Sequence, residues 1–386
     1  MARPKKEENN SGIVDSVKIA AESFYKANKS NIYGEYHDPY KVSFGVFSLD
    51  VLTGGGVPGG TLLRLIGSPN SGKSSEGLLI IKNFLESRPK SRALIIPTEA
   101  RLTEKMKGRS GVKFVDKPED WANNTCLVLQ MNVYEKIANF IWTLVKTNEM
   151  RPKEEQENLA IMIDSMDYLT LESDLDKDIG DTLKVAGPQF LTKKLWAKLA
   201  LPFNAGGHIF IANSQISSAP KIDPYSKDPI RQGGSSGGNA IQHQASTVIE
   251  FAQRYEGDYL LEDENAKYDE KKNPKIGHTI KGWIRKSDNE KYDVKFEYAV
   301  KYGRTNGNSV FVERELVDML ITWELLKKES AQGSAIVNPD LLTEMRKIDA
   351  EFPDKFRSIG RAVEYLESKP EAAKHLVEKF KKMLSK

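Results

Sequence analysis

The chain has 386 residues, of which 39% are hydrophobic and 29% are charged, and its formal net charge is +3. This composition is typical of a globular protein of two or three domains with a large buried core, and so small a net charge does not by itself indicate a nucleic-acid partner. The single cysteine, Cys126, lies in an apolar run, which excludes a disulfide framework and a cysteine-rich zinc site.

The N-terminal region is predicted to be a tail followed by one helix. The opening stretch, MARPKKEENNSG, carries charges with no apolar run behind them. No stretch of the chain approaches the roughly 18 apolar residues of a membrane span, so we expect a cytoplasmic protein without a membrane partner. Residues 13–30 are predicted to form a helix, because apolar side chains recur at the spacing of one helix face at Val14, Val17, Ala20, Ala21 and Phe24.

Short apolar runs then alternate with helical segments. The runs lie at 61–66, 92–97, 126–130, 159–164, 208–213 and 246–251, and helical patterns separate most of them, for example at 74–87 and 134–147. Continuous apolar runs joined by helices indicate an α/β fold with a mainly parallel sheet covered by helices on both faces.

The pattern changes beyond about residue 277. Residues 278–287 and 291–303 show partial alternation with no room for a crossover helix, so we expect antiparallel edge strands there. The charged stretch 255–275 is predicted to be an exposed, solvated loop, and the chain beyond about 314 to be helical. The predicted domains are an N-terminal tail and helix at 1–40, a core at 41–330 and a helical C-terminal region at 331–386.

The stretch GSPNSGKS at 67–74 matches the phosphate-binding pattern G-x-x-x-x-G-K-[ST] without exception. An apolar strand precedes it and a helix follows, so backbone N–H groups and a helix N-terminus would converge on one anion. Lys73 would reach the β- and γ-phosphates and Ser74 would bind Mg²⁺; the alternative is a glycine-rich turn with a solvated lysine. The predicted nucleotide-binding residues are Gly67, Ser68, Pro69, Asn70, Ser71, Gly72, Lys73, Ser74 and Ser75.

Polar side chains follow three of the apolar runs, where ligands of an open α/β sheet bind. Asp164 ends the run LAIMID and would hold Mg²⁺ or its water, with Asp167 as the competing carboxylate. Glu99 would polarise a water against the γ-phosphate, and Gln215 would sense that phosphate. Together with the phosphate-binding loop, these residues supply the parts that metal-assisted nucleotide hydrolysis needs.

Two connections are longer than simple links. The first, 165–189, is acidic at its centre, and the second, 216–240, combines cations, an aromatic ring and a glycine pair. Such a composition suits single-stranded nucleic acid, whose phosphates are neutralised and whose bases stack. The alternative is a disordered surface loop. The predicted DNA-binding residues of the second connection are Lys221, Tyr225, Lys227, Arg231, Gly237 and Gly238.

Over roughly residues 40–330, the chain resembles the RecA-type strand-exchange recombinases, with the closest likeness to the UvsX-like recombinases of phages. The segments that carry the resemblance are FGVFSLDVLTGGGVPGGTLLRLIGSPNSGKSS, IIPTEA, IMIDSMDYL, ANSQ and GGNAIQHQAS. The first segment is shared with circadian-clock and repair ATPases of the same superfamily. The resemblance implies a RecA-type P-loop ATPase core that uses ATP and Mg²⁺.

The same resemblance implies a DNA-dependent ATPase that forms helical filaments on single-stranded DNA and promotes homologous pairing and strand exchange in recombination and repair. Its partners would be single-stranded DNA, double-stranded DNA during pairing, further copies of the chain with ATP at the subunit interface, and a mediator or single-strand-binding protein. A phage-encoded chain would act in the host cytoplasm. Two alternatives stay open: a hexameric helicase or clock-type ATPase on the same core, and a non-catalytic protein that coats DNA as a filament.

The resemblance also implies roles for particular residues. Gln215 would couple the γ-phosphate to the DNA-binding loop, which Gly237, Gly238 and Asn239 would close. Lys286, in the stretch WIRKSDNEK, would reach the phosphates held by the neighbouring subunit, as an arginine finger does, with Arg285 as the alternative.

The chain departs from the family pattern at several positions. Asp288 stands where relatives have a second basic residue, which Lys291 would replace. Thr103 and Met106 stand where relatives place an aspartate and a tyrosine around the adenine, whereas Tyr302 would still stack on the ring. The stretch FYKA in the N-terminal helix is expected to pack on the adjacent subunit.

Overall fold

The computed structural model describes most of the chain, and the described residues fall into two compact units. The described ranges are 16–34, 39–178, 187–216, 238–263, 266–289, 292–329 and 333–384. By their internal contacts the units are Met1–Glu35 and Tyr36–Lys386. No helix in these ranges is both long enough and apolar enough to cross a membrane.

The first unit contains the predicted N-terminal helix. Helix α1 spans Ser16–Ala27 and has no buried residue, and its apolar side chains Val17 and Phe24 are 78% and 65% exposed. A 3₁₀ turn, Lys29–Asn31, follows it. The helix prediction is therefore confirmed, with an apolar face that no described residue of its own unit covers.

The second unit is built on a large mixed sheet, and the described residues contribute ten strands to it. Their order is β10-β11-β9-β3-β8-β7-β4-β6-β5, with β12 paired to β11. All pairs from β9 to β5 are parallel. The strands are β3 (Thr61–Gly67), β4 (Ser91–Pro97), β5 (Phe114–Val115), β6 (Cys126–Val128), β7 (Asn158–Asp164), β8 (Ile209–Gln215), β9 (Thr247–Phe251), β10 (Tyr259–Leu261), β11 (Lys275–Lys286) and β12 (Val294–Lys301).

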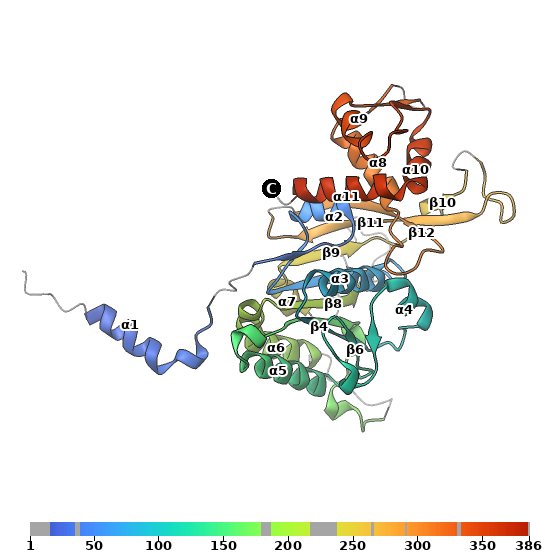
Figure 1. Cartoon of the computed structure of the whole chain (residues 1–386). Helices are drawn as coiled ribbons and strands as arrows, with labels where there is room; N and C mark the ends of the chain where they lie inside the picture. Colours follow the sequence, from blue (N-terminus) through green and yellow to red (C-terminus); the bar gives the residue numbers. More distant parts are fainter. Residues whose placement is uncertain are drawn as a thin grey trace, which may run out of the picture. The chain divides into compact units, whose positions relative to one another are not determined.

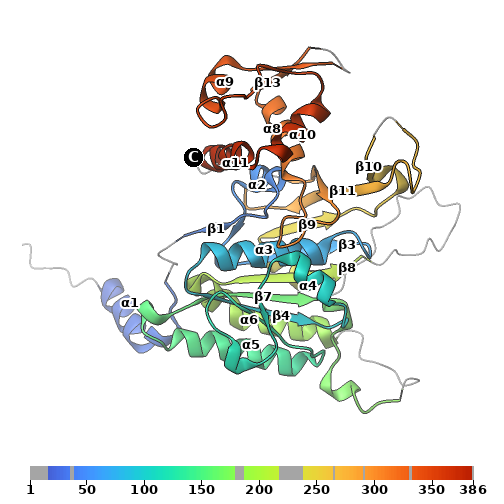
Figure 2. The same cartoon turned by 45° about the vertical axis from the view of Figure 1, so that its right-hand side comes forward.

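Helices cover both faces of the sheet, as the continuous apolar strands require. Along β3, Leu63 and Leu65 belong to one core cluster and Leu62 and Ile66 to the other. Figures 1 and 2 show α3 and α4 on one face and α5 and α6 on the opposite face. The helices are α3 (Lys73–Ser87), α4 (Glu104–Ser110), α5 (Tyr134–Glu149), α6 (Gly187–Gly206) and α7 (Gly238–Gln244). The predicted α/β fold with a mainly parallel sheet is confirmed.

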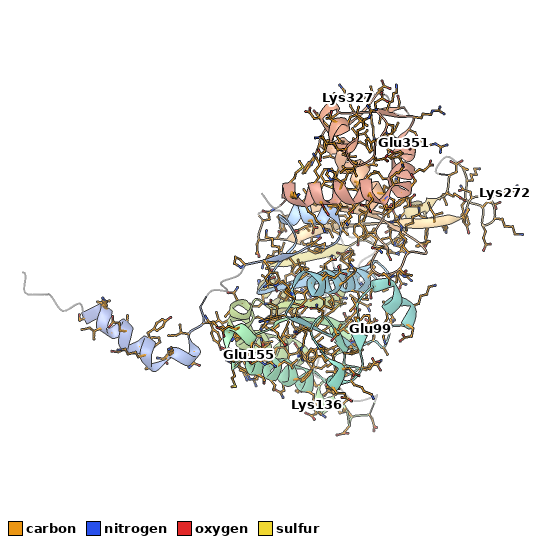
Figure 3. All side chains as sticks on the ribbon, in the orientation of Figure 1. Glu99, Lys136, Glu155, Lys272, Lys327 and Glu351 are labelled. Atoms are coloured by element: carbon orange, nitrogen blue, oxygen red, sulfur yellow. The ribbon has the colours of Figure 1, made fainter. Side chains whose placement is uncertain are left out.

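The edge strands β10, β11 and β12 are antiparallel, as expected for β11 and β12. The prediction of a solvated loop over 255–275 is wrong in part, because β10 pairs with β11 through Tyr259 and His278. The side chain of Asn273 donates to the Asp263 carbonyl at 2.9 Å and so closes the segment beyond β10. Figure 3 shows Lys272 at the outer end of this segment. A three-residue strand among charged residues left no periodic signal in the sequence.

The C-terminal region is helical and also contains a small antiparallel sheet that the sequence analysis missed. The helix predicted over 314–328 ends at Thr322, Glu324 adopts a positive φ of 57°, and a strand begins at Leu326. Pairing of that strand with the nearby segment Ala335–Val337 overrides its local helical pattern. The elements are α8 (Val312–Thr322), β13 (Leu326–Lys328), β14 (Ala335–Val337), α9 (Pro339–Met345), β15 (Lys355–Phe356), α10 (Ile359–Ser368) and α11 (Pro370–Leu384).

A short segment precedes β3 in the chain and packs against the C-terminal region. It consists of β1 (Lys41–Val42), α2 (Phe47–Thr53) and β2 (Val57–Pro58). The ring of Phe47 packs edge-on against Phe380 of α11, with the ring centroids 6.1 Å apart. The domain boundaries at 40 and 330 stay predictions. The remaining 3₁₀ turns are Pro118–Asp120, Lys153–Glu155, Met166–Tyr168, Glu172–Asp174 and Glu256–Asp258.

Candidate nucleotide-binding site

The predicted phosphate-binding loop connects β3 to α3. Gly67 has a φ of +152°, and a Cβ atom there would lie 2.4 Å from the carbonyl oxygen of Phe251, so a larger residue cannot fit. Asn70 and Gly72 adopt φ values of 58° and 111°, and Gly72 is the N-cap of α3. The glycines therefore permit a tight turn that ends at a helix N-terminus, which is a favourable position for an anion.

The ammonium of Lys73 lies over this loop. Its Nζ atom donates to the carbonyl oxygens of Gly67 at 2.9 Å and Ser68 at 2.8 Å. Burial lowers the pKa of Lys73, and the nearby carboxylates Asp164, Asp167 and Glu99 oppose that shift. A buried cation among carboxylates at the first turn of a helix is suited to binding a polyphosphate.

Four neighbouring strands bring the predicted residues to one edge of the sheet. The order β3-β8-β7-β4 places the loop next to Gln215, Asp164 and the segment that carries Glu99. In register, Gly67 pairs with Gln215 and Pro97 with Asp164. These strands are parallel, so their carboxyl ends meet at the same edge. The structure therefore assembles side chains that lie up to about 150 residues apart in the chain.

Asp164 adjoins the first turn of α3. It accepts a hydrogen bond from Nδ2 of Asn213 at 3.0 Å and another from the Ser74 hydroxyl. Burial raises the pKa of Asp164, and these two hydrogen bonds and Lys73 oppose the shift. The Ser74 and Asp164 oxygens are therefore held together at the loop.

Glu99 is fixed by three donors. Its Oε1 atom accepts hydrogen bonds from the Ser165 hydroxyl at 2.6 Å and from Nε2 of Gln215 at 2.9 Å. Its Oε2 atom lies 3.2 Å from a guanidinium nitrogen of Arg101. Figure 3 labels Glu99 on the segment between β4 and α4. The predicted general base and the predicted phosphate sensor are thus in direct contact.

Asp167, the competing metal ligand, has a different role in the structure. Its Oδ2 atom accepts the backbone N–H of Gln215 at 2.8 Å and so holds the end of β8. Of the two carboxylates, Asp164 is the one hydrogen-bonded to Ser74, which favours it as the predicted metal ligand.

The Ser74–Asp164 pair fits Mg²⁺ bound together with a nucleotide. Within the described part of the chain, no three His, Cys, Asp or Glu side chains are grouped so that they could hold a metal ion by themselves. Mg²⁺ usually needs only one or two protein ligands, because waters and substrate phosphates complete its octahedron. The two adjacent oxygens of Ser74 and Asp164 meet that requirement.

A cavity of about 470 Å³ extends from the loop, a size suited to a drug-sized or nucleotide-sized ligand. Its walls include Met106 and Tyr302, which the sequence analysis placed near the adenine base. They also include Arg254 and His278, which the sequence analysis missed. The sequence carried no signal for these two residues, because neither belongs to a motif.

Arg254 and His278 connect the loop to Tyr302. A guanidinium nitrogen of Arg254 lies 3.3 Å from the Asn70 carbonyl oxygen and 2.7 Å from Nε2 of His278. The other ring nitrogen of His278 lies 3.1 Å from the Tyr302 hydroxyl. Burial and the neighbouring guanidinium of Arg254 lower the pKa of His278 to about 4, so this imidazole is neutral near pH 7. His278 therefore orients Tyr302 through its hydroxyl, and the Tyr302 side chain lines the cavity.

The basic residues predicted to act on a neighbouring subunit lie on β11. Lys286 donates to the His243 carbonyl of α7 at 3.1 Å. Arg285 forms ion pairs with Glu250, at 2.6 Å, and with Asp293. Because its charge is already balanced by two carboxylates, Arg285 is the poorer candidate of the two.

Most of the predicted DNA-binding residues lie outside the described residues. These are Lys221, Tyr225, Lys227, Arg231 and Gly237, and Lys291 also lies outside them. Gly238 and Asn239 are the first residues of α7.

No family model matches the chain, and no curated protein matches it either.

Proposed function

We propose that the chain is an ATP-dependent DNA recombinase of the RecA type. It would be a DNA-dependent ATPase that assembles on single-stranded DNA and promotes homologous pairing and strand exchange. The observation that carries this proposal is the contact between Glu99 and Gln215 at 2.9 Å, beside a complete phosphate-binding loop. This contact joins the hydrolytic carboxylate to the residue from which the predicted DNA-binding connection begins.

Each residue of the site has a defined part in hydrolysis. The loop N–H groups and Lys73 would bind the β- and γ-phosphates, and Ser74 and Asp164 would hold Mg²⁺. Bound Mg²⁺ would neutralise charge on the phosphate oxygens. Glu99 would orient a water for attack on the γ-phosphorus and accept its proton, with its carboxylate held by Ser165 and Arg101.

Gln215 supports the proposed link between nucleotide and DNA. Its amide nitrogen binds Glu99, so an arriving γ-phosphate would compete for that nitrogen and change the position of the side chain. A ligand with different affinities for two conformations shifts the population between them. ATP would therefore act as the ligand that favours the DNA-binding state, and its hydrolysis would release the DNA.

Further parts of the proposal rest on the family resemblance. The nucleotide would lie between subunits of a helical filament, with Lys286 reaching the neighbouring site. Double-stranded DNA would enter during pairing, and a mediator or single-strand-binding protein would assist loading. The cavity supports a purine nucleotide, because the Tyr302 ring at its wall can stack on a purine, and ATP is the one that the resemblance implies.

The decisive test combines ATPase assays with electron microscopy of the full-length protein. We expect single-stranded DNA to stimulate phosphate release, and helical filaments to form with DNA and a slowly hydrolysed ATP analogue. Closed six-membered rings would favour the helicase or clock-type alternative. Filaments whose ATP is hardly turned over, with or without DNA, would favour a non-catalytic coating protein.

A further inference from the structure

Three polar side chains from the antiparallel edge of the large sheet form a connected row in the wall of the cavity. They are Arg254, in the segment after β9, His278 on β11, and Tyr302 directly after β12. His278 is 8% exposed, whereas Tyr302 is 40% exposed. The row thus leads from a buried imidazole to a phenol that a ligand in the cavity can reach.

The hydrogen bonds of this row determine the tautomer of His278. A guanidinium nitrogen of Arg254 lies 2.7 Å from Nε2 of His278. Arginine carries donors only and keeps its charge in proteins, so Nε2 has to accept this hydrogen bond. Burial and the guanidinium groups of Arg254 and Arg109 lower the pKa of His278 to about 4, and the charge of Asp258 opposes that shift. The ring is therefore neutral near pH 7, and its one N–H proton lies on Nδ1.

This tautomer sets the direction of the next hydrogen bond. Nδ1 of His278 lies 3.1 Å from the Tyr302 hydroxyl oxygen, and its N–H donates to that oxygen. A tyrosine hydroxyl that accepts a hydrogen bond still has its own O–H to donate. Among the described residues, none accepts the Tyr302 O–H. The hydroxyl is therefore left with a proton to donate to a ligand in the cavity.

We propose that Arg254 and His278 are positioning residues that fix the Tyr302 hydroxyl as a hydrogen-bond donor to the nucleoside part of the bound nucleotide. The phosphates have other donors, the loop N–H groups and Lys73, so the acceptor would be an uncharged atom of the base or the ribose. This inference rests on the proposed function for the identity of the ligand. It goes beyond that function, in which Tyr302 contributes only the face of its ring and Arg254 and His278 have no part.

The tautomer of His278 can be measured without any nucleotide. In protein labelled with ¹⁵N at its five histidines, long-range proton–nitrogen couplings of the rings distinguish Nδ1–H from Nε2–H. The signal that is absent in His278→Gln belongs to His278, and it should have the Nδ1–H pattern. In Arg254→Met that pattern should be lost, because the donor that requires Nε2 to accept is gone. An Nε2–H ring in the wild type, or an unchanged pattern in Arg254→Met, would overturn the inference.

Binding measurements test whether His278 acts on the ligand through Tyr302. His278→Phe keeps a flat ring and removes both nitrogens, and Tyr302→Phe removes only the hydroxyl. Each should weaken binding of a slowly hydrolysed ATP analogue by about threefold to tenfold, the usual contribution of one hydrogen bond. The double variant should bind as weakly as Tyr302→Phe and no weaker, because the two residues belong to one network. Calorimetric titration gives the four affinities.

A conservative variant and a matched control accompany these measurements. His278→Gln offers an acceptor to Arg254 and a donor to Tyr302, so its affinity should return to within about twofold of the wild type. His375→Phe makes the same change at a histidine of the C-terminal region, whose ring contacts Glu344 at 2.7 Å, and should bind the analogue like the wild type.

Tripolyphosphate, which has no nucleoside, is the control ligand. Its affinity should be the same in the wild type, His278→Phe and Tyr302→Phe. An equal loss for tripolyphosphate and the ATP analogue would place the effect at the phosphate-binding loop, which Arg254 contacts at Asn70, and would overturn the inference. Losses that add in the double variant would overturn it as well. If the wild type does not bind the ATP analogue, the proposed function itself fails, whereas additive losses in a protein that binds it refute the inference alone.

Discussion

Two buried clusters of ionisable side chains lie on either side of the first turn of α3. Lys73 begins the helix and faces Glu99 and Asp164, so its cluster contains a cation and opens onto the cavity. Three residues later, Glu76 is buried and accepts a hydrogen bond from the Tyr298 hydroxyl at 2.6 Å. The second cluster is completed by Asp50 of α2 and Glu315 of α8.

The two clusters differ in the groups that surround their carboxylates. In the first, burial raises the pKa of Asp164, and the hydrogen bonds from Asn213 and Ser74 and the charge of Lys73 oppose that shift. In the second, burial raises the pKa of Glu76 and of Glu315 to about 8 and that of Asp50 to about 6. Glu76 and Glu315 are therefore mostly protonated near pH 7 and serve as neutral hydrogen-bonding groups. Burial thus raises the pKa of acids in both clusters, and the hydrogen bonds and charges that oppose the shift differ between them.

Removal of the cation from the first cluster should have the largest effect. Lys73→Ala should reduce ATP hydrolysis by about 10³-fold or more. The variant lacks the ammonium that is proposed to bind the phosphates and to stabilise the transition state. Phosphate release measures this loss. Lys82→Ala, in the same helix and paired with the exposed Glu86, is the matched control and should retain activity. Hydrolysis by Lys73→Ala at the wild-type rate would remove the distinction between the clusters.

Neutralisation of the predicted general base should have the next largest effect. Glu99→Gln should lower turnover by about 10²–10³-fold while nucleotide binding stays within a few fold. The amide keeps an acceptor for Ser165 but cannot accept a proton. Single-turnover hydrolysis and fluorescent-nucleotide titration separate the two quantities. Glu104→Gln, on the exposed side of α4, controls for the same chemical change. A parallel loss of binding would contradict the general-base assignment.

The second cluster should make the stability of the folded protein depend on pH. Glu76 loses its proton near the ordinary pKa of 4.5 in the unfolded chain but near 8 in the folded protein. The folded state therefore binds more protons between these values, and its stability falls as the pH rises through this window. Glu76→Gln cannot ionise, so relative to the wild type it should gain about 1–3 kcal/mol between pH 5 and pH 8.

Urea denaturation at several pH values measures this gain. Glu86→Gln, at the exposed end of α3, should follow the wild-type profile, since its carboxyl lies in water. A Glu76→Gln profile parallel to the wild type would show that Glu76 is already ionised in the folded protein.

The smallest effect should follow the loss of one hydrogen bond in the second cluster. Tyr298→Phe leaves Oε2 of Glu76 without its donor and should cost about 1–2 kcal/mol in the free energy of unfolding. ATP hydrolysis should stay within about threefold, because the phenylalanine ring keeps the shape of the cavity wall to which Tyr298 contributes. Tyr292→Phe, which is 78% exposed, is the control for stability. A loss of activity much larger than the loss of stability would place the second cluster in catalysis.

The predictable part of the site consists of features that neighbouring residues encode. The glycine and lysine spacing at 67–74 specifies a loop of fixed geometry, and the structure has that loop between β3 and α3. Asp164 and Gln215 were found as polar residues that end apolar runs, and the parallel sheet order brings them together. In these cases short-range pattern and chain topology lead to the same arrangement.

The unpredicted part depends on contacts between distant residues. Arg254 and His278 reach the cavity from the segment after β9 and from β11, and Tyr298 reaches Glu76 across 222 positions of the chain. The strand at Leu326 is a different case, because it pairs with β14, a nearby segment, where the local pattern was helical. No spacing rule within one segment contains such information.

The sequence by itself determined the α/β fold class, the glycine-rich loop at 67–74 and the polar residues at the strand ends, because local periodicity and turn chemistry specify all three. Only the tertiary structure decided which carboxyl groups have shifted pKa values. Burial raises the pKa values of Asp50, Glu76, Asp164 and Glu315, and each is opposed by different hydrogen bonds and charges. Both are properties of packing, since desolvation and Coulomb interactions depend on which distant segments surround each group.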